Sequence, residues 1–265
     1  MKRLPIMGLG LILALALTGS CIITVVDYGP SGYPKADEYE KSLPLPMGGT
    51  VSLNNIKGDI EIRGWERAQV DIFAEKLMPI PRETKVRILR WDRSLPDIDV
   101  DRLEDHVRIR TRPARDREAS PVNYYHSVPE AVNLKDITAE SGSIFVYDLY
   151  GESDIELKEG DIQIDNFSGS LNASVVTGSV KARLYDLREE DVIRIDTQRG
   201  DVTVFLQPQV GALIEAEAQG GEIISDFDLG LNPPANKVSA SIGETGAKLS
   251  LSTLDGNVYI RMIKE

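Results

Sequence analysis

The sequence predicts an all-β protein, a single-chain parallel β-solenoid with coils of about 18 to 22 residues. Two observations lead to this fold class. Glycines recur at an unbroken period of nine, and a fixed period indicates a repeat architecture. Apolar and polar residues alternate after most of these glycines, as in Ile162, Gln163 and Ile164, which is typical of strands that bury one face. The glycines of this period are Gly142, Gly151, Gly160, Gly169 and Gly178.

The longer glycine spacing favours a solenoid over a sandwich of hairpins. The steps from Gly142 through Gly160, Gly178 and Gly200 to Gly221 are 18, 18, 22 and 21 residues. A solenoid requires such a near-constant coil length, and its coils stack at about 4.8 Å with inward aliphatic ladders. We therefore expect positive φ or close approach of neighbouring coils at Gly178 and Gly200. An earlier copy of the pattern begins at Gly58 and stands alone.

The N-terminus has the features of an exported lipoprotein. Two basic residues precede an apolar stretch over residues 4–17, which is too short for a bilayer span of about 20 residues. Small residues then lead to Cys21, the only cysteine. This arrangement resembles the lipobox of bacterial lipoproteins, except that Thr18 stands where leucine is usual. The resemblance implies a signal peptide over residues 1–20 and a lipid on Cys21, with an ordinary signal peptide or an uncleaved anchor as the alternatives.

The remaining chain divides into a tether and one domain. Residues 21–46 are predicted to form the lipidated N-terminus and a short tether, because proline and glycine are dense there. The solenoid is expected over residues 47–265. Within it, residues from about 78 to 132 lack the glycines and carry six prolines, which predicts an irregular insert. Alternation at residues 86–88 and 107–109 predicts two strands inside that insert.

An arginine cluster lies in this insert, although the chain is acidic, with 30 Lys+Arg, 42 Asp+Glu and a net charge of −12. That charge makes nucleic acid an unsuitable partner. One interpretation of the cluster is a solvated strand face beside acidic neighbours. The other is a patch for an anionic glycan or lipid headgroup, since guanidinium groups bind carboxylate and phosphate in bidentate fashion. The cluster consists of Arg108, Arg110, Arg112, Arg115 and Arg117.

The sequence offers little for catalysis or metal binding. Two histidines and one cysteine provide neither a structural zinc site nor an intramolecular disulfide, and no cofactor is expected. His106 and His126 are expected at the surface or in loops. Four carboxylates near coil corners are candidates for polysaccharide cleavage, although acidic corners also solubilise a solenoid. They are Asp161, Asp165, Asp196 and Asp201.

Aromatic side chains are predicted on outward strand positions. Such rings either stack on sugars or form ladders across neighbouring strands. They are Phe145, Tyr147, Phe205 and Tyr259.

Four segments resemble a known family. They are 58–65, 200–206, 220–226 and 246–260, with Trp65, Pro208 and the Gly-Asp-Val-Thr-Val-Phe-Leu run among their features. They are similar to the bacterial "putative adhesin" β-solenoid domain, a large family of unknown function. The similarity covers residues from about 51 to 263. It implies a stack of short strands on secreted or membrane-anchored proteins and implies no catalytic residues.

These observations predict a non-catalytic lipoprotein of the cell envelope that acts as a binding, adhesion or scaffolding module. Its N-terminal lipid would hold it on an extracytoplasmic membrane surface, the outer membrane where the organism has one. The expected partners are an envelope polysaccharide or another envelope protein. The alternative is a carbohydrate-active β-helix enzyme, which needs two carboxylates converging in a cleft about 5 to 10 Å apart.

Overall fold

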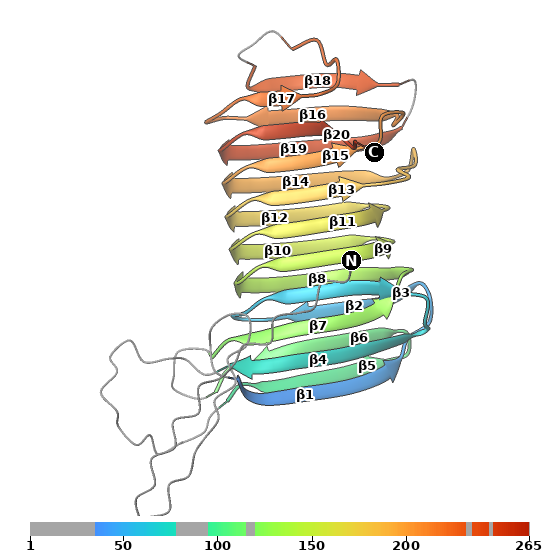
Figure 1. Ribbon diagram of the computed structural model, residues 1–265, viewed down its shortest axis with the longest axis vertical. Helices are drawn as coiled ribbons and strands as arrows, with labels where there is room; N and C mark the ends of the chain where they lie inside the picture. The colour runs from blue at the N-terminus through green and yellow to red at the C-terminus, as the bar shows by residue number, and fades with distance from the viewer. Residues whose placement is uncertain (1–34, 78–94, 115–119, 232–234, 244–245, 265) are drawn as a thin grey trace, which may run out of the picture.

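The protein forms an elongated stack of strands with no helix that could cross a membrane in the residues described (Figure 1). The computed structural model describes residues 35–77, 95–114, 120–231, 235–243 and 246–264. Their strands make two ten-stranded sheets that enclose one continuous hydrophobic core. The predicted all-β solenoid is therefore confirmed.

Neighbouring strands within each sheet are hydrogen-bonded in a fixed spatial order. Sheet 1 runs β1 (Lys35–Pro44), β4 (Gln69–Leu77), β7 (Val122–Pro129), β3 (Ile60–Trp65), β9 (Ile144–Tyr150), β11 (Ile162–Ser168), β13 (Val180–Leu184), β15 (Val202–Leu206), β20 (Val258–Met262) and β17 (Ile223–Ser225). Sheet 2 runs β5 (Asp97–Leu103), β6 (His106–Arg112), β2 (Gly49–Asn54), β8 (Val132–Ser141), β10 (Ser153–Glu159), β12 (Leu171–Thr177), β14 (Val192–Arg199), β19 (Ala247–Asp255), β16 (Ala212–Ala218) and β18 (Lys237–Ile242).

Each coil of the central stack gives one strand to each sheet, and identical registers build inward ladders. Ile162 lies between Ile144 and Val180 of the adjacent coils, and all three side chains are fully buried. The adjacent Gln163 is only half-buried and lies on the outer face. The predicted inward and outward register is therefore correct, because period-two alternation is set by burial of one face.

Glycine is required at the coil corners for the two reasons predicted. Gly178 has φ of 136°, and a Cβ there would lie 1.8 Å from the carbonyl oxygen of Gly160. Gly200 has φ of 139°, and its Cβ would lie 2.1 Å from the carbonyl oxygen of Gly178. A side chain at either corner would hold neighbouring coils apart.

The spatial order of the coils departs from their sequence order at both ends of the stack. The coil of β19 and β20 lies between the coils that contain β15 and β17. Gly256 therefore separates Gly200 from Gly221, and the prediction that these two belong to neighbouring coils is wrong. At the other end β3 pairs with β9, so Gly58 stacks directly beneath Gly142 instead of standing alone.

Two predicted boundaries are also wrong. The tether was expected to extend to residue 46, but residues 35–44 form β1, which pairs antiparallel with β4. The insert expected over residues 78–132 contains β5, β6 and β7, all paired within the sheets. The strand expected at residues 107–109 is confirmed as part of β6, and the one at 86–88 lies outside the described residues. The insert's prolines mislead because several lie next to a strand or at its last position instead of interrupting it: Pro96, Pro113, Pro121 and Pro129.

Polar side chains enter the core near the β1 end. Tyr124 is fully buried, and its hydroxyl lies 2.7 Å from that of Thr111, which donates to Asn55 Oδ1 at 2.9 Å. Burial, the largest cause, raises the pKa of Tyr124 to about 12. His126 is also buried, which contradicts its expected place at the surface or in a loop. It lies at an inward position of β7. The prediction failed because inward positions were identified by their apolar residues, and a histidine at such a position does not fit that pattern.

Candidate functional site

The described arginines of the predicted cluster lie on β6, opposite a row of aspartates. Arg108 pairs across the strands with Asp101, and Arg110 with Asp99. Arg112 makes an ion pair with Asp99. These carboxylates share the face of the arginines and balance their charge. Arg115 and Arg117, like Cys21, lie outside the described residues, and binding of an external anion by the cluster stays a prediction.

The four candidate catalytic carboxylates are all engaged by the neighbouring coil. Asp161 accepts a hydrogen bond from the backbone N–H of Ser179 at 2.8 Å, and Asp201 accepts one from Asn257 at 2.8 Å. These two aspartates thus belong to the hydrogen-bonded corners of the stack. The remaining pairs lie on the sheets and join Asp165 to Arg183 and Asp196 to Ser252. Each of these four carboxylates therefore has a structural role as a contact between neighbouring coils.

The outward aromatic residues gather on the outer surface of sheet 1, which we call the aromatic face. All four predicted rings lie there and are half-buried. Sequence reasoning missed two more, Phe73 on β4 and Tyr125 on β7, because these strands lie outside the regular glycine repeat. The alternation of Tyr125 with the inward residues of β7 was the signal that could have found it. The aromatic face carries Phe73, Tyr125, Phe145, Tyr147, Phe205 and Tyr259.

Cationic side chains stack on several of these rings. The Arg63 guanidinium lies 4.5 Å from the ring centroid of Tyr147, and the Arg183 guanidinium lies 5.3 Å from that of Phe205. Arg183 is also held by Asp165 at 2.8 Å. Stacking and ion pairing together restrict the guanidinium groups, so their donors are presented in fixed positions.

The same arrangement recurs near the C-terminal end of the aromatic face. Arg261 lies 5.1 Å from the ring centroid of Tyr259 and 2.9 Å from a carboxylate oxygen of Asp226. The backbone N–H of Met262 and then the Arg261 side chain, both hydrogen-bonded to Asp226, hold the pKa of that carboxyl below its usual range. Stacked cations and paired carboxylates thus accompany the rings from β3 to β20.

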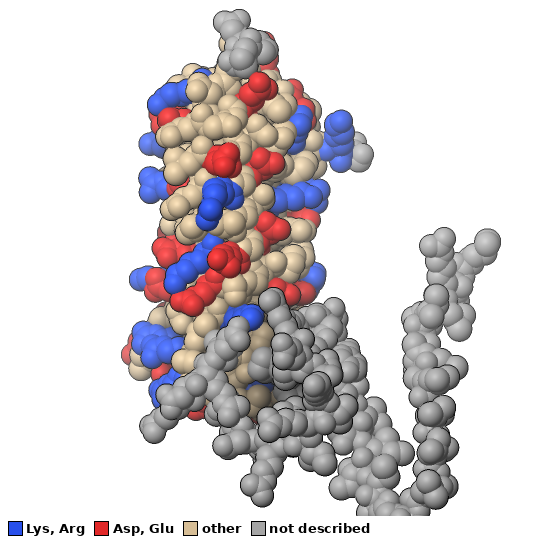
Figure 2. Space-filling model, turned by 90° about the vertical axis from the view of Figure 1, so that its left-hand side faces the viewer, with Lys and Arg blue, Asp and Glu red and all other residues tan. Residues whose placement is uncertain are grey.

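Opposite charges also alternate elsewhere on the surface. Figure 2 shows one side of the stack, and acidic and basic side chains are interspersed where the surface of the described residues is visible. This visible surface presents no long stretch of a single charge that could attract a polyelectrolyte from a distance.

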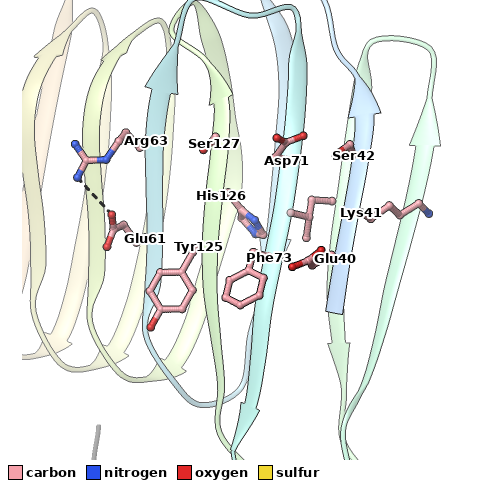
Figure 3. Close-up of a pocket in the computed structure, with 11 residues that line it drawn as sticks. Glu40, Lys41, Ser42, Glu61, Arg63, Asp71, Phe73, Tyr125, His126 and Ser127 are labelled. Atoms are coloured by element: carbon pink, nitrogen blue, oxygen red, sulfur yellow. Dashed lines mark hydrogen bonds and ion pairs between the residues drawn. The ribbon is translucent and has the colours of Figure 1, made fainter. Parts of the chain in front are cut away.

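A pocket of about 440 Å³ lies at the β1 end of the aromatic face, and we call it the β1-end pocket (Figure 3). It crosses four neighbouring strands, β1, β4, β7 and β3, which the pairing places side by side. Its lining residues are Glu40, Lys41, Ser42, Glu61, Arg63, Asp71, Ile72, Phe73, Tyr125, His126 and Ser127.

Strand register arranges the outward residues of this pocket in two rows. The first row runs Glu40, Phe73, Tyr125, Glu61, and the second runs Ser42, Asp71, Ser127, Arg63. The two central rings of the first row have centroids 5.9 Å apart and planes tilted by 36°. An aromatic pair is therefore flanked by a carboxylate on either side.

The β1-end pocket is acidic. The Arg63 guanidinium lies 3.4 Å from both Glu61 and Asp148, so carboxylates already neutralise it. The Lys41 ammonium donates to the Val100 carbonyl on sheet 2 at 3.4 Å, and Figure 3 shows this side chain extending away from the rings. Burial, the largest cause, and the nearby Glu75 raise the pKa of the Tyr125 hydroxyl.

Within the parts of the chain that the structure describes, no group of three or more His, Cys, Asp or Glu side chains could hold a metal ion. Of the pocket carboxylates, Glu61 on β3 lies three strands from Glu40 on β1, so all three cannot converge on one ion. The arrangement of rings, carboxylates and fixed guanidinium groups is instead one that binds an organic ligand through stacking and hydrogen bonds.

Several solved structures align with this chain. A putative cell adhesion protein from Clostridium sporogenes aligns with a TM-score of 0.50 and 14% identity, over 86% of this chain and 100% of that one. A putative adhesin from Bacteroides fragilis gives 0.37 and 13%, over 86% and 97%. A putative lipid binding protein from Parabacteroides distasonis gives 0.29 and 9%, over 86% and 97%. At such identities the similarity to the Clostridium protein supports the fold alone. A search of curated proteins found no match.

The family relationship rests on the sequence itself. The Toastrack DUF4097 family matches residues 42–261, which include the whole central stack and most of the strands at either end. The resemblance to a β-solenoid family of unknown function, first carried by the glycine-led segments, is confirmed. The chain belongs to the Toastrack DUF4097 family.

Proposed function

We propose that this protein is a non-catalytic binding module of the cell envelope, and that its aromatic face binds a linear polysaccharide. The observation that carries the proposal is the recurrence of outward rings with stacked cations along one side of the solenoid. A lipid on Cys21 would anchor the module on an extracytoplasmic membrane surface, where envelope polymers are present.

The spacing of the rings suits a polymer better than a small ligand. The rings lie in three clusters along the stack, on β4 and β7, on β9, and on β15 and β20. Charged strands separate them, so the distance from β9 to β15 is three strand spacings, or roughly 14 Å. One extended chain that runs along the stack would contact all three clusters.

The chemistry of the aromatic face suits sugar rings. Aromatic side chains offer flat apolar surface, and the polar neighbours Gln163, Asp165 and Thr203 offer donors and acceptors for hydroxyl groups. Most cations of the face have a carboxylate partner, and the net charge of −12 opposes long-range attraction of an acidic polymer. A neutral or amine-bearing polysaccharide is therefore the ligand that the face fits best.

The test compares polysaccharide affinities of the full-length protein and a variant that lacks two rings. A glycan array with detergent-solubilised protein identifies the polymer that binds, and titration calorimetry then measures its affinity. We expect the double variant Tyr147→Ala and Phe205→Ala to bind at least tenfold more weakly, or about 1.4 kcal/mol. The control Val176→Ala removes an exposed apolar side chain from sheet 2 and should bind normally. Equal affinity of wild type and double variant would contradict the proposal.

A second candidate function rests on one pair of carboxylates in the β1-end pocket. Glu40 and Asp71 are diagonal neighbours on β1 and β4, a geometry with about 7 to 8 Å between the residues. Inverting glycosidases separate their carboxyl groups by about 6.5 to 9.5 Å. Asp71 also accepts a hydrogen bond from Gln69 at 2.6 Å. Release of reducing ends from a bound polysaccharide, abolished by Glu40→Gln, would favour the enzyme; an intact polymer after prolonged incubation favours the binding module.

A further inference from the structure

We propose that the β1-end pocket binds an ammonium group, so that the polysaccharide recognised at this end of the aromatic face carries free amines. The inference about the polymer rests on the proposed function. The inference about the pocket rests on its own side chains. It names a class of ligand, an amino sugar with an unsubstituted amine, that the rest of the aromatic face does not specify.

The β1-end pocket combines aromatic rings with carboxylates. Phe73 and Tyr125 form the centre of the first row, with Glu40 and Glu61 on either side and Asp71 in the second row. A cation is attracted to the face of an aromatic ring, and neighbouring carboxylates add an ionic attraction to the same cation. Rings flanked by carboxylates suit an ammonium group better than a neutral sugar hydroxyl.

The chain itself places one ammonium group, that of Lys35, next to the β1-end pocket. Lys35 Nζ lies 5.6 Å from the ring centroid of Phe73 and 3.1 Å from a carboxylate oxygen of Glu75. It also makes an ion pair with Glu38. Glu38 and Glu75 form the next row along the same two strands, beside Glu40 and Phe73. The chain's own ammonium thus lies between the carboxylates of one row and the ring of the next. That next row offers the carboxylate of Glu40 beside Phe73, adds the ring of Tyr125, and contains no lysine.

The charges of the β1-end pocket also favour a cationic ligand. Three carboxylates line it, from Glu40, Glu61 and Asp71, against two cations, Arg63 and Lys41, and the Lys41 ammonium donates to the Val100 carbonyl on sheet 2. Arg63 lies at the border toward β9, where Glu61 and Asp148 hold it. Among the described residues no ion pair involves Glu40 or Asp71, so their charge remains available to a ligand. The raised pKa of Tyr125, caused first by burial and then by Glu75, agrees with a negative potential at the rings.

A metal ion fits this pocket less well than an amine. Glu40 and Glu61 are three strand spacings apart, or roughly 14 Å, whereas carboxylate ligands of one calcium ion lie within 2.3 to 2.6 Å of it. An ammonium needs no such convergence, because it can contact one carboxylate and one ring.

The experiment compares two forms of one polymer on the full-length protein. Glucosamine oligomers with free amines and their N-acetylated counterparts of equal length are titrated at a pH at which the amines are protonated. We expect the free-amine form to bind at least tenfold more tightly. The double variant Glu40→Gln and Asp71→Asn should remove this preference. The matched control Glu156→Gln and Glu215→Gln, which changes two exposed carboxylates on sheet 2, should retain it.

The outcomes separate this inference from the proposed function. Equal affinity for the two forms, or an unchanged preference in the pocket variant, overturns the inference. The proposed function survives that result where removal of Tyr147 and Phe205 still weakens binding. Where neither oligomer binds, propylammonium is titrated instead and the NMR signals of Phe73 and Tyr125 are followed. Shifts that disappear in the pocket variant support the inference without the polymer, and unperturbed signals overturn it.

Discussion

His126 occupies a core position that its neighbours fill with isoleucine. It pairs with Ile62 on β3 and with Ile72 on β4, and it is 2% exposed. Neither ring nitrogen has a side-chain or backbone hydrogen-bond partner among the described residues. Burial lowers its pKa to about 3. The imidazole is therefore neutral in the folded protein.

This burial predicts a loss of stability in mild acid. The unfolded chain binds the proton with a pKa of about 6.5, so stability from neutral His126 is present above that pH and is lost as the pH falls toward 3. The loss should reach about 2 kcal/mol by pH 5. Urea unfolding at pH 7.5, 6 and 5 measures it. His126→Phe should lack this part of the pH dependence, and His106→Gln should retain it. An identical pH slope in wild type and His126→Phe would show that the histidine is not desolvated.

Gly178 tests the coil corner at the same scale. A Cβ at this position would lie 1.8 Å from a backbone oxygen, whereas a Cβ at Gly48 would meet nothing within 4 Å, although both residues have positive φ. Gly48→Ala should therefore lower the free energy of unfolding by about 1 kcal/mol through backbone strain. Gly178→Ala should lower it by roughly 3 kcal/mol or more, because the next coil must move. Similar losses in urea unfolding would argue against close stacking of the corners.

At the scale of the elements, β5 and β6 decide the role of the arginine cluster. We expect weak affinity for dextran sulfate at low salt, because aspartates on β5 oppose the arginines. Joint replacement of Arg108, Arg110 and Arg112 by glutamine should lower this affinity and leave binding of neutral glycans unchanged. A several-fold rise in salt should weaken binding by wild type and have little effect on the triple variant. Equal binding of the acidic polymer by both proteins would identify the cluster as a solvated strand face.

The elements also show what the sequence could and could not predict. Strands β9 to β15 follow from alternation after glycines, because each buries one face against a common core. β1 has only partly buried inward residues such as Tyr39 and Leu43, so its alternation is weak. The neighbours of β20 and β3 were unpredictable, because a constant period gives the length of a coil and not its partner in the stack. Of the site, the rings on the regular coils were predicted, and those of the β1-end pocket were missed with β4 and β7.

At the scale of the whole molecule, the proposed anchor places the stack on a membrane. Cys21→Ser should release the protein from the membrane fraction and remove the lipid mass from its N-terminal peptide, because serine offers no sulfur for the acyl chains that would hold the protein on the membrane. The 14 Cα–Cα steps from Cys21 to Lys35 reach at most about 50 Å, so Lys35, the first residue of β1, would lie within that distance of the surface. Fractionation and mass spectrometry measure both effects. A variant that remains in the membrane fraction would disprove lipid anchoring.

The aromatic face is the feature that joins fold and proposed function over the whole molecule. Parallel stacking places the same outward positions of successive coils in line. Aromatic residues at a few of these positions therefore form a surface that extends along the solenoid. Antiparallel strands β1, β5 and β18 form three of the four sheet edges, and the regular parallel stack extends along the sides of the solenoid between them (Figure 1).

Hydroxyl-radical footprinting of the full-length protein, with and without its bound polysaccharide, tests the central claim most directly. The account predicts that the polymer protects Tyr147, Phe205 and Tyr259 from oxidation together, since one chain covers all three. The exposed Leu213 on sheet 2 and Leu103 at the end of β5 should be oxidised equally in both samples. Protection of sheet 2 with unchanged oxidation of the three rings would contradict the account.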